Sequence, residues 1–157
     1  KKAIKNKNLA KEINFLKREK KFSKSKISSE DTLLSMFNKF KYLKKYKNLM
    51  LLQPTSPFRT EGHIQRSYKI YKKNKLKTLV SVIKVKNKNN SKNYFYKNKN
   101  SFKTNGAIYI TNIRFFLKKK LLFTKNTYLM PMSRRNSADI DSKYDLKTAR
   151  LQVEKYK

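Results

Sequence analysis

The sequence predicts an α/β domain built on a mainly parallel β-sheet, because short apolar and β-branched runs alternate along the chain with segments of helical periodicity. The chain has 157 residues, which is enough for one domain with a buried core. Its hydrophobic fraction is 38%, with 10 Phe and 10 Tyr, and this fraction is too high for a disordered basic tail. We therefore expect a single domain over residues 1–157.

Three segments have the periodicity of amphipathic helices. The first begins after Ser28 and has Glu30 and Asp31 in its first turn, as helix N-termini prefer. The second spans 61–74 and the third spans 142–157. The apolar positions that recur on one face are, in chain order, Leu33, Phe37 and Phe40; Ile64, Tyr68 and Tyr71; and Leu146, Ala149 and Val153. We expect each set to form the buried face of its helix.

Three further segments are predicted to be strands. Residues 48–53 form a short apolar run before a proline, and residues 76–85 are rich in β-branched side chains. Residues 107–110 form a third apolar run. The stretch 86–104 between the last two is polar and lacks a pattern, so we expect an exposed loop or hairpin there.

The formal net charge of +33, from 42 Lys and Arg against 9 Asp and Glu, raises the question of a nucleic-acid partner. The lysines are spread from Lys1 to Lys157 and form no single basic block. Arg, which binds phosphates and guanine edges best, is scarce. An A/T-rich coding sequence would also raise Lys, Asn, Ile, Phe and Tyr together. The charge therefore favours compositional drift over a nucleic-acid surface and leaves both open.

Several chemistries are excluded or disfavoured by what the chain lacks. It has no Cys, so disulfides, thiolate metal sites and a Cys nucleophile are excluded. Its single His, His63, argues against a His-based triad or zinc site. No apolar run approaches the roughly 18 residues that span a bilayer, and the N-terminal residues lack the pattern of a signal peptide. We expect a cytoplasmic protein without a membrane-spanning helix.

The sharpest local feature is the pair Asp139 and Asp141, because three of the chain's four Asp lie within 139–145. In an extended segment the two side chains would project from the same face. Two such carboxylates suit Mg²⁺, which completes its shell with water and substrate phosphates. The alternative is helix capping, in which Asp141 or Ser142 caps the last helix and Asp145 favours its first turn. The residues alone leave both interpretations open.

A second candidate is the loop that follows the first predicted strand. A strand of an open α/β sheet delivers such a loop to its carboxyl edge, where ligands bind. Pro54 and Pro57 would hold the loop rigid, and the amide of Gln53 both donates and accepts hydrogen bonds. The alternative, which these residues alone favour, is a proline-stiffened turn before a helix that carries His63 on its surface.

Four ordered motifs resemble the acylneuraminate cytidylyltransferases, the CMP-sialic acid synthetases. They are Leu51–Thr60 (Leu-Leu-Gln-Pro-Thr-Ser-Pro-Phe-Arg-Thr), Val80–Val82, Asn105–Ile110, and Ser137–Ser142 with Asp145. Phe15–Arg18 and Ser29–Asp31 also look like segments that this family places before the first motif. The resemblance covers nearly the whole chain. It favours the metal interpretation of Asp139 and Asp141 over capping, and it argues against a nucleic-acid partner.

The resemblance implies a three-layer αβα fold of the nucleotide-diphospho-sugar transferase type, which is Rossmann-like, and a homodimer. It implies an enzyme that transfers CMP from CTP to a sialic-type nonulosonic acid, releases pyrophosphate and uses Mg²⁺. The implied roles are metal binding by Asp139 and Asp141, nucleotide binding by Arg18, Ser29 and Gln53, and substrate binding by Gln53, Asn105, Tyr109 and Phe123. Asn105 and Tyr109 would share one face of a strand, and Phe123 would reach the sugar pocket of a partner subunit. The resemblance assigns no catalytic residue here.

Three departures from the family pattern bear on activity. The phosphate-binding loop with which the family opens has no counterpart, and Lys1 falls after it. The segment between Val85 and Asn105 is shorter than usual and lacks an Arg-x-Gln element, and Ala138 stands where the family has Ile. We therefore expect residues 1–157 alone to be catalytically inactive, N-terminally incomplete and only marginally folded. The alternative from another class is a basic RNA-binding protein of ribosomal type.

Overall fold

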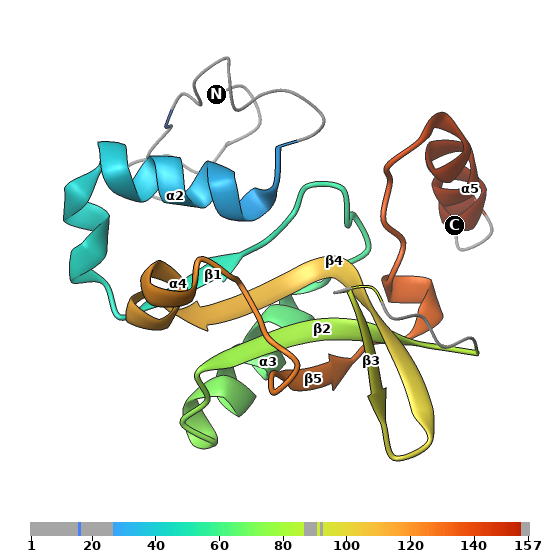
Figure 1. Cartoon of the computed structure of the whole chain (residues 1–157). Coiled ribbons are helices and arrows are strands. Elements are labelled where there is room, and N and C mark those ends of the chain that lie inside the picture. The colour runs from blue at the N-terminus through green and yellow to red at the C-terminus, as the bar shows by residue number, and fades with distance from the viewer. Residues whose placement is uncertain (1–15, 17–26, 87–90, 92, 155–157) are drawn as a thin grey trace. The chain divides into compact units, whose positions relative to one another are not determined.

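The computed structural model (Figure 1) describes residues 16, 27–86, 91 and 93–154. The chain divides into two compact units, Lys1–Leu43 and Lys44–Lys157. The predicted α/β class is confirmed, because helices alternate with the strands of a mixed sheet. A single domain over 1–157 stays a prediction. In the described part of the chain, no helix has the length and apolar character needed to span a membrane.

The first unit contains the first predicted helix, α2, which spans Ser29–Lys39. Ser28 is its N-cap, and the Ser28 side-chain oxygen accepts the backbone N–H of Asp31 at 3.0 Å. The buried side chains of α2 are Leu33 and Phe37. A 3-10 helix, η2 (Lys41–Lys45), follows and crosses the boundary between the two units. The predicted start of α2 is confirmed, and so are Leu33 and Phe37 of its buried face, whereas Phe40 is the half-buried C-cap that follows the helix.

The second unit is built on a five-stranded sheet. Its strands are β1 (Asn48–Leu51), β2 (Thr78–Val85), β3 (Tyr94–Lys97), β4 (Asn100–Asn112) and β5 (Tyr128–Pro131). The strand order is β1-β4-β2-β5, and β3 pairs with the first residues of β4. The long strand β4 is therefore the centre of the sheet, since it pairs with β1, β2 and β3.

The expectation of a mainly parallel sheet is wrong for the pairing of the described strands. β1, β2 and β3 each run antiparallel to β4, whereas β2 and β5 pair in parallel. The reason is a tight hairpin, in which Asn98 and Lys99 alone reverse the chain between β3 and β4. The stretch 86–104 therefore contains a hairpin, as one of the two expectations had it, but it is not exposed throughout, because β4 begins at Asn100 and buries Ser101 and Thr104. β1, β2 and β5 still run in one direction, with their arrowheads toward the right in Figure 1, so their carboxyl ends share one edge of the sheet.

Helix α3, Glu61–Lys73, connects β1 to β2 where a helix was predicted. Of its expected buried face, Tyr71 is buried and Ile64 packs on the core, whereas the expectation for Tyr68 is wrong, since this side chain is 47% exposed. The N-terminus of α3 is closed by a capping box between Thr60 and His63. Nδ1 of His63 accepts the backbone N–H of Thr60 at 3.2 Å, and the hydroxyl of Thr60 accepts the N–H of His63 at 3.4 Å. The one His of the chain therefore has a structural role at a helix start.

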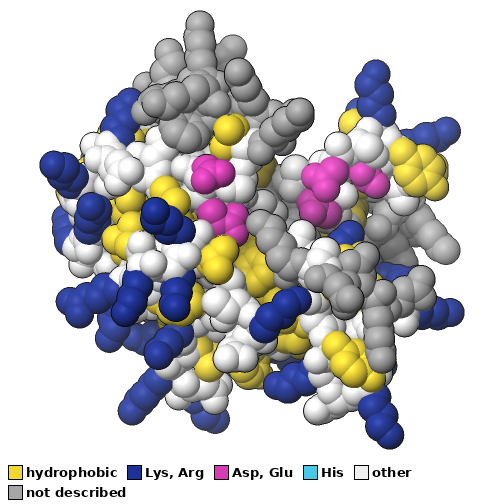
Figure 2. Space-filling view, viewed as in Figure 1, with side chains coloured by type: hydrophobic (Ala, Val, Ile, Leu, Met, Phe, Trp, Pro, Cys, Tyr) yellow, Lys and Arg dark blue, Asp and Glu magenta, His cyan; other side chains and the backbone are white. Residues whose placement is uncertain are grey.

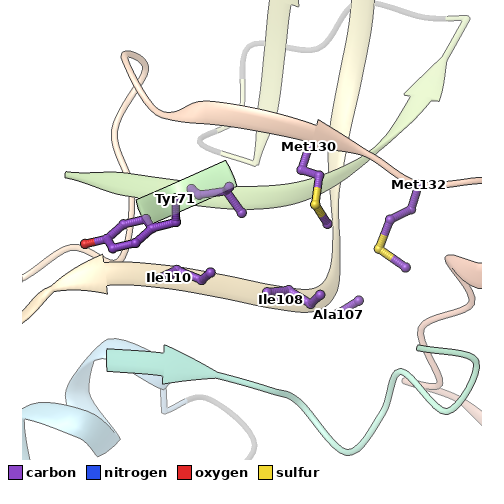
Figure 3. Close-up of a cluster of buried hydrophobic side chains, with 7 residues drawn as sticks. Tyr71, Ala107, Ile108, Ile110, Met130 and Met132 are labelled. Atoms are coloured by element: carbon purple, nitrogen blue, oxygen red, sulfur yellow. The ribbon is translucent and has the colours of Figure 1, made fainter. Parts of the chain in front are cut away.

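The main core lies between α3 and one face of the sheet (Figure 3). Its buried members are Tyr71, Leu79, Ala107, Ile108, Ile110, Met130 and Met132. Ile64 and Ile70 of α3 pack against this cluster. Burying one side chain of this size contributes about 1.5–3 kcal/mol, so the cluster fixes α3 on β2, β4 and β5.

Aromatic side chains lie on the opposite face of the sheet. Tyr109 alternates along β4 with residues that face α3, so its ring points away from that helix. The ring stacks on Phe123 with 5.8 Å between centroids, and Phe123 lies 5.7 Å from the ring of Phe95 on β3. Helix α4 (Ile113–Lys119) follows β4 directly. Its buried residues are Ile113 and Phe116.

After β5 the chain forms a 3-10 helix, η3 (Arg134–Asn136), and the last helix, α5 (Lys143–Glu154). The predicted helix is confirmed, but its predicted buried face is largely wrong. Ala149 is buried, whereas Leu146 is 40% and Val153 is 44% exposed. The helix therefore packs through one small side chain. Sequence reasoning also missed α4 and β5, which are too short to show a clear period.

The β3–β4 hairpin generates a stability prediction. Asn98 and Lys99 have φ values of 50° and 61°, the left-handed pair of a type I′ turn, for which Asn-Gly is preferred. A left-handed conformation costs a residue with a Cβ roughly 1–2 kcal/mol. Glycine avoids this cost, but it loses more backbone entropy on folding, which offsets part of the gain. Lys99→Gly should therefore stabilise the chain by about 0.5–1 kcal/mol in urea unfolding. Lys97→Gly, placed in β3, is the control and should destabilise it; a loss of stability in Lys99→Gly would contradict this turn.

Candidate functional site

The candidate site is centred on Gly106, where two polar side chains from distant segments converge. Gly106 lies in β4 with φ of +74°. A Cβ at this position would lie 2.9 Å from Oε1 of Gln53 and 2.8 Å from Oδ2 of Asp139. Both side chains therefore reach this point because residue 106 has no side chain. We call Gln53, Gly106 and Asp139 the Gly106 site.

The Gly106 site lies at the edge of the sheet that holds the carboxyl ends of β1, β2 and β5. Gln53 follows β1 by two residues, and Asp139 follows β5 and η3. This is the edge at which open α/β sheets bind their ligands. The prediction that the loop after the first strand lies at the carboxyl edge of the sheet is therefore confirmed.

The backbone of β4 is irregular on both sides of Gly106. Val80 on β2 is opposite Tyr109, whereas Val82 is opposite Thr104, so one β2 residue faces four on β4. That residue is Ser81, which is fully buried. Its hydroxyl oxygen accepts the N–H of Ile108 at 2.8 Å and lies 2.6 Å from Oδ1 of Asn105. Ser81 thus replaces the ladder hydrogen bonds that the irregularity removes.

The side chain of Asn105 is used within the fold. It is 3% exposed, and its amide donates to Oγ of Ser137 at 2.9 Å and to the sulfur of Met132 at 3.4 Å. The expectation that Asn105 and Tyr109 share one face is wrong, because the left-handed residue Gly106 interrupts the alternation of the strand. The role of Asn105 in substrate binding stays a prediction.

The loop that carries Gln53 is fastened to β4 by Arg59. Nη1 of Arg59 donates to the carbonyl oxygen of Gln53 at 3.1 Å and to that of Ala107 at 2.8 Å. Burial lowers the pKa of this guanidinium from its ordinary value. The hydroxyl of Ser56, also buried, donates to the carbonyl oxygen of Asn105 at 3.3 Å. The loop is thus held by hydrogen bonds on both sides of Gly106 as well as by its two prolines.

Asp139 is a half-buried residue, and one of its two carboxylate oxygens makes no hydrogen bond within the described part of the chain. Its Oδ1 is buried and has no hydrogen-bond partner among the described residues. Burial raises the pKa of the Asp139 carboxyl, and the nearby charges of Asp141 and Asp145 raise it further. A hydrogen bond from Thr55 and the charge of Lys103 act against this rise. A buried carboxylate oxygen without a partner lowers the stability of the folded chain unless a proton, a cation or a hydrogen-bond donor binds it.

The two interpretations of the acidic cluster apply to different residues. The predicted cap of α5 is formed by Ser142 with Asp145 in the first turn: the Ser142 hydroxyl oxygen accepts the N–H of Asp145 at 3.2 Å. Oδ2 of Asp145 accepts the backbone N–H of Ser142 at 2.8 Å and that of Asp141 at 3.2 Å. The hydroxyl of Ser142 also donates to this oxygen, and these bonds lower the pKa of Asp145. Asp139 takes no part in this cap, and the side chain of Asp141 is exposed. Capping therefore accounts for Asp145 and leaves Asp139 and Asp141 for another role.

The donor set fits a hard cation held mainly by water and ligand oxygens. In the described part of the chain, no group of three or more His, Cys, Asp or Glu could hold a metal ion. A closed protein cage is therefore absent there, whereas Mg²⁺ needs only one or two carboxylates. The unbonded Oδ1 of Asp139 is the atom that such an ion would satisfy.

Other residues that the resemblance singled out lie elsewhere or have structural contacts. Arg18 lies outside the described residues. Ser29 is the first residue of α2 in the first unit, so it is not placed relative to the Gly106 site. Tyr109 is 8% exposed and stacks on Phe123 of the same chain. The ligand roles of these four residues stay predictions.

Sequence reasoning missed the residues that hold the site together, namely Gly106, Arg59 and Ser81. Gly106 had a signal, because the chain has only two glycines. Arg59 and Ser81 stood inside quoted motifs, but nothing in their neighbours indicated that they bond to carbonyl and amide groups of β4. Such bonds join residues that are up to 48 positions apart.

Comparison with known proteins agrees with the motifs. The chain is 31% identical over 122 residues to the N-acylneuraminate cytidylyltransferase of Escherichia coli O18:K1:H7, and this match covers 66% of the chain and 29% of that protein. It is 26% identical over 151 residues to the enzyme of the same name from Streptococcus agalactiae serotype III, covering 85% of the chain and 36% of the relative. The chain thus spans about a third of the length of these relatives. No family model matches the sequence. The resemblance to the N-acylneuraminate cytidylyltransferases is confirmed.

The contact distances at Gly106 generate a matched pair of predictions for the two glycines. Gly106→Ala should destabilise the chain by about 2 kcal/mol or more, because a left-handed Ala alone costs roughly 1–2 kcal/mol and its Cβ would also displace Gln53 and Asp139. Gly62→Ala is the control: it lies in α3, its Cβ would meet Oγ1 of Thr60 at 3.8 Å, and it should be neutral or stabilising. Urea unfolding of both variants provides the measurement. Equal effects of the two substitutions would show that the approach at Gly106 is not tight.

The state of Asp139 generates a prediction about pH. Because folding raises the pKa of this carboxyl above 3.8, the folded state binds the proton more tightly and stability is lost as pH rises through the raised pKa. Asp139→Asn removes this loss and should stabilise the metal-free chain at neutral pH by about 1 kcal/mol. The gain should shrink as pH falls through the titration of the carboxyl, measured by urea unfolding in EDTA. The exposed Asp141→Asn is the control, and an Asp139→Asn chain that is less stable at neutral pH would refute the argument.

Proposed function

We propose that this chain forms part of an enzyme that transfers CMP from CTP to a sialic-type nonulosonic acid, giving a CMP-sugar and pyrophosphate. One observation carries the proposal: Gln53, Gly106 and Asp139 come from three separate motifs of the resemblance and meet at one point. Chance similarity along a sequence has no reason to converge in space. The reaction itself is taken from the name of the relatives.

In this proposal Asp139 and Asp141 hold Mg²⁺. The buried Oδ1 of Asp139 lacks a partner, and a cation would provide one in place of a proton. When bound, Mg²⁺ supplies positive charge that neutralises phosphate oxygens in phosphoryl and nucleotidyl transfer. The exposed carboxylate of Asp141 leaves room for the water and phosphate ligands that complete the shell of the ion.

The chain's own residues orient the ligands. The amide of Gln53 both donates and accepts, and Arg59 fixes the backbone from which it extends. Gln53 is the amide that we place at the ligand, because its Oε1 converges with Oδ2 of Asp139 on Gly106 at the carboxyl edge of the sheet. Arg59 is a positioning residue in this scheme, because it acts through Gln53 and the β4 backbone.

The remaining expectations belong to the same proposal, and all except the location rest on the resemblance alone. They are a homodimer, a cytoplasmic location, nucleotide contacts by Arg18 and Ser29, and sugar contacts by Tyr109 and Phe123. The relatives reported above give no support to the RNA-binding alternative.

Manganese tests the metal site without requiring turnover. Mn²⁺ replaces Mg²⁺ at oxygen sites and broadens nearby amide signals in NMR spectra. We expect selective broadening at Gly106, Ile140 and Asp141, and we expect Asp139→Asn and Asp141→Asn each to abolish it. Asp31→Asn in α2 is the control and should leave the broadening unchanged. Broadening that survives both variants would reject the assignment of the metal to this pair.

CTP then tests the substrate side of the proposal. With Mg²⁺ present, CTP should shift the amide signals around Gly106, and N-acetylneuraminate should shift those of Gln53 and its neighbours. Gln53→Ala should weaken binding of the sugar acid more than binding of CTP, since one lost hydrogen bond to a ligand costs about 1 kcal/mol or more. Shifts by CTP that do not need the metal, or an equal loss of both ligands in Gln53→Ala, would contradict the assigned roles.

A further inference from the structure

A cavity lies at the edge of the sheet opposite the Gly106 site. It has a volume of about 720 Å³ and is lined by residues at the starts of β1 and β2, the end of β4, the end of α3 and helix α4. Backbone hydrogen bonds shape this edge, since the N–H of Asn112 donates to the carbonyl of Lys77 at 2.9 Å and that of Ile113 to the carbonyl of Lys47 at 3.0 Å. Lys47 and Lys77 therefore flank the end of β4 on its two sides.

The rim of this cavity is cationic. Its basic residues are Lys47, Lys72, Lys75, Lys77, Arg114 and Lys118, all exposed. None of the described residues that line the cavity is acidic. In Figure 2, Lys and Arg side chains gather over the side of the molecule that carries α4. An adjoining cavity of about 340 Å³ shares Lys47 and Arg114 and adds Lys44 and Lys45.

Local structure explains only part of this charge. Lys72 and Lys118 lie in the last turns of α3 and α4, where cations are favoured by the helix dipole. Arg114 lies in the first turn of α4, where a cation is disfavoured, and Lys47 and Lys77 stand before strands. Like charges around one cavity repel, so these three positions weaken the free chain unless an anion occupies the space between them.

The floor of the cavity is apolar and partly aromatic. It is formed by Tyr71, Leu76 and Phe115. The ring of Tyr71 packs on the core, while its hydroxyl points away from the core cluster (Figure 3) and donates to Oδ1 of Asn48 at 3.0 Å. The ring of Phe115 is half-buried and so keeps some surface available. The volume falls in the range of small-molecule sites, roughly 300–1,000 Å³.

We propose that this cavity binds a nucleoside polyphosphate at a site separate from the Gly106 site. The cations of the rim would bind the phosphates, and the aromatic floor would accept the flat base. Phosphate is favoured over a carboxylate ligand because several converging cations match several charges on one small group. A small ligand is favoured over a nucleic acid because the cavity has the volume of one nucleotide-sized molecule and an apolar floor.

Calorimetric titration with ATP and with inorganic tripolyphosphate tests the site in the chain as printed. EDTA removes the metal that the Gly106 site requires, so that site should not bind ATP under these conditions. Salt at about 150 mM screens the general attraction between the basic chain and the phosphates beyond about 8 Å. Lys77→Gln/Arg114→Gln should weaken ATP binding about tenfold or more, because it removes two charge-assisted contacts. Lys69→Gln/Lys147→Gln is the matched control with the same change in net charge, and it should alter binding less than about twofold.

Two further comparisons distinguish the contribution of the base from that of the phosphates, and this cavity from the Gly106 site. ATP should bind more tightly than tripolyphosphate, and Phe115→Leu should remove that difference. Asp139→Asn should leave ATP binding unchanged. Equal losses in the two double variants, tripolyphosphate binding as tightly as ATP, or loss of ATP binding in Asp139→Asn would each overturn the proposal. An oligouridylate that depends on Lys77 and Arg114 as strongly as ATP does would also overturn it, in favour of a nucleic-acid surface.

Discussion

The close approach of two polar side chains to the backbone of Gly106 is the constraint on which the candidate site depends. Gln53 and Asp139 come from opposite sides of β4 in sequence, and both occupy the space where a Cβ would stand. This approach requires a glycine in the left-handed conformation, and such a residue makes the pairing of β4 with β2 irregular. Ser81 then accepts a backbone hydrogen bond that the irregular pairing leaves without a strand partner. Arg59 then ties the Gln53 loop to the same stretch of backbone. The site is therefore one connected arrangement rather than a set of independent residues.

Charge acts in opposite ways at the two ends of the sheet. At the Gly106 site a carboxylate is held half-buried among other carboxylates, in a chain with a net charge of +33. At the opposite edge, cations surround a cavity with no described acidic residue in its lining. Each arrangement raises the free energy of the folded chain until a partner of the other sign arrives. The overall composition conceals this polarity, because a count of lysines says nothing about where the few acids lie.

The elements that could be predicted from the sequence are those whose signals are local. The spacing of Leu33 and Phe37, the loop after β1, and α3 with its buried Tyr71 all follow from periodicity and turn residues. The direction of β4 did not follow, because it is set by a two-residue hairpin inside a polar stretch without pattern. The contacts of Asn105 also did not follow, because they depend on partners that only the folded backbone selects. The resemblance found the right segments, and the structure shows which side chains in them are already used by the fold.

The central position of β4 has a consequence for how the chain folds. Asn48 pairs with Asn112, so that contact closes a loop of 112 − 48 = 64 residues, whereas the β3–β4 hairpin closes over two. Local hairpins form in microseconds, and contacts between distant residues form late because they must first overcome the entropy of the closed loop. The hairpin and its pairing with β2 can therefore form before β1 joins the sheet. Gln53 reaches Gly106 only when β1 is in place, so the site is completed at the last stage of folding and its NMR signals would report on the fully assembled chain.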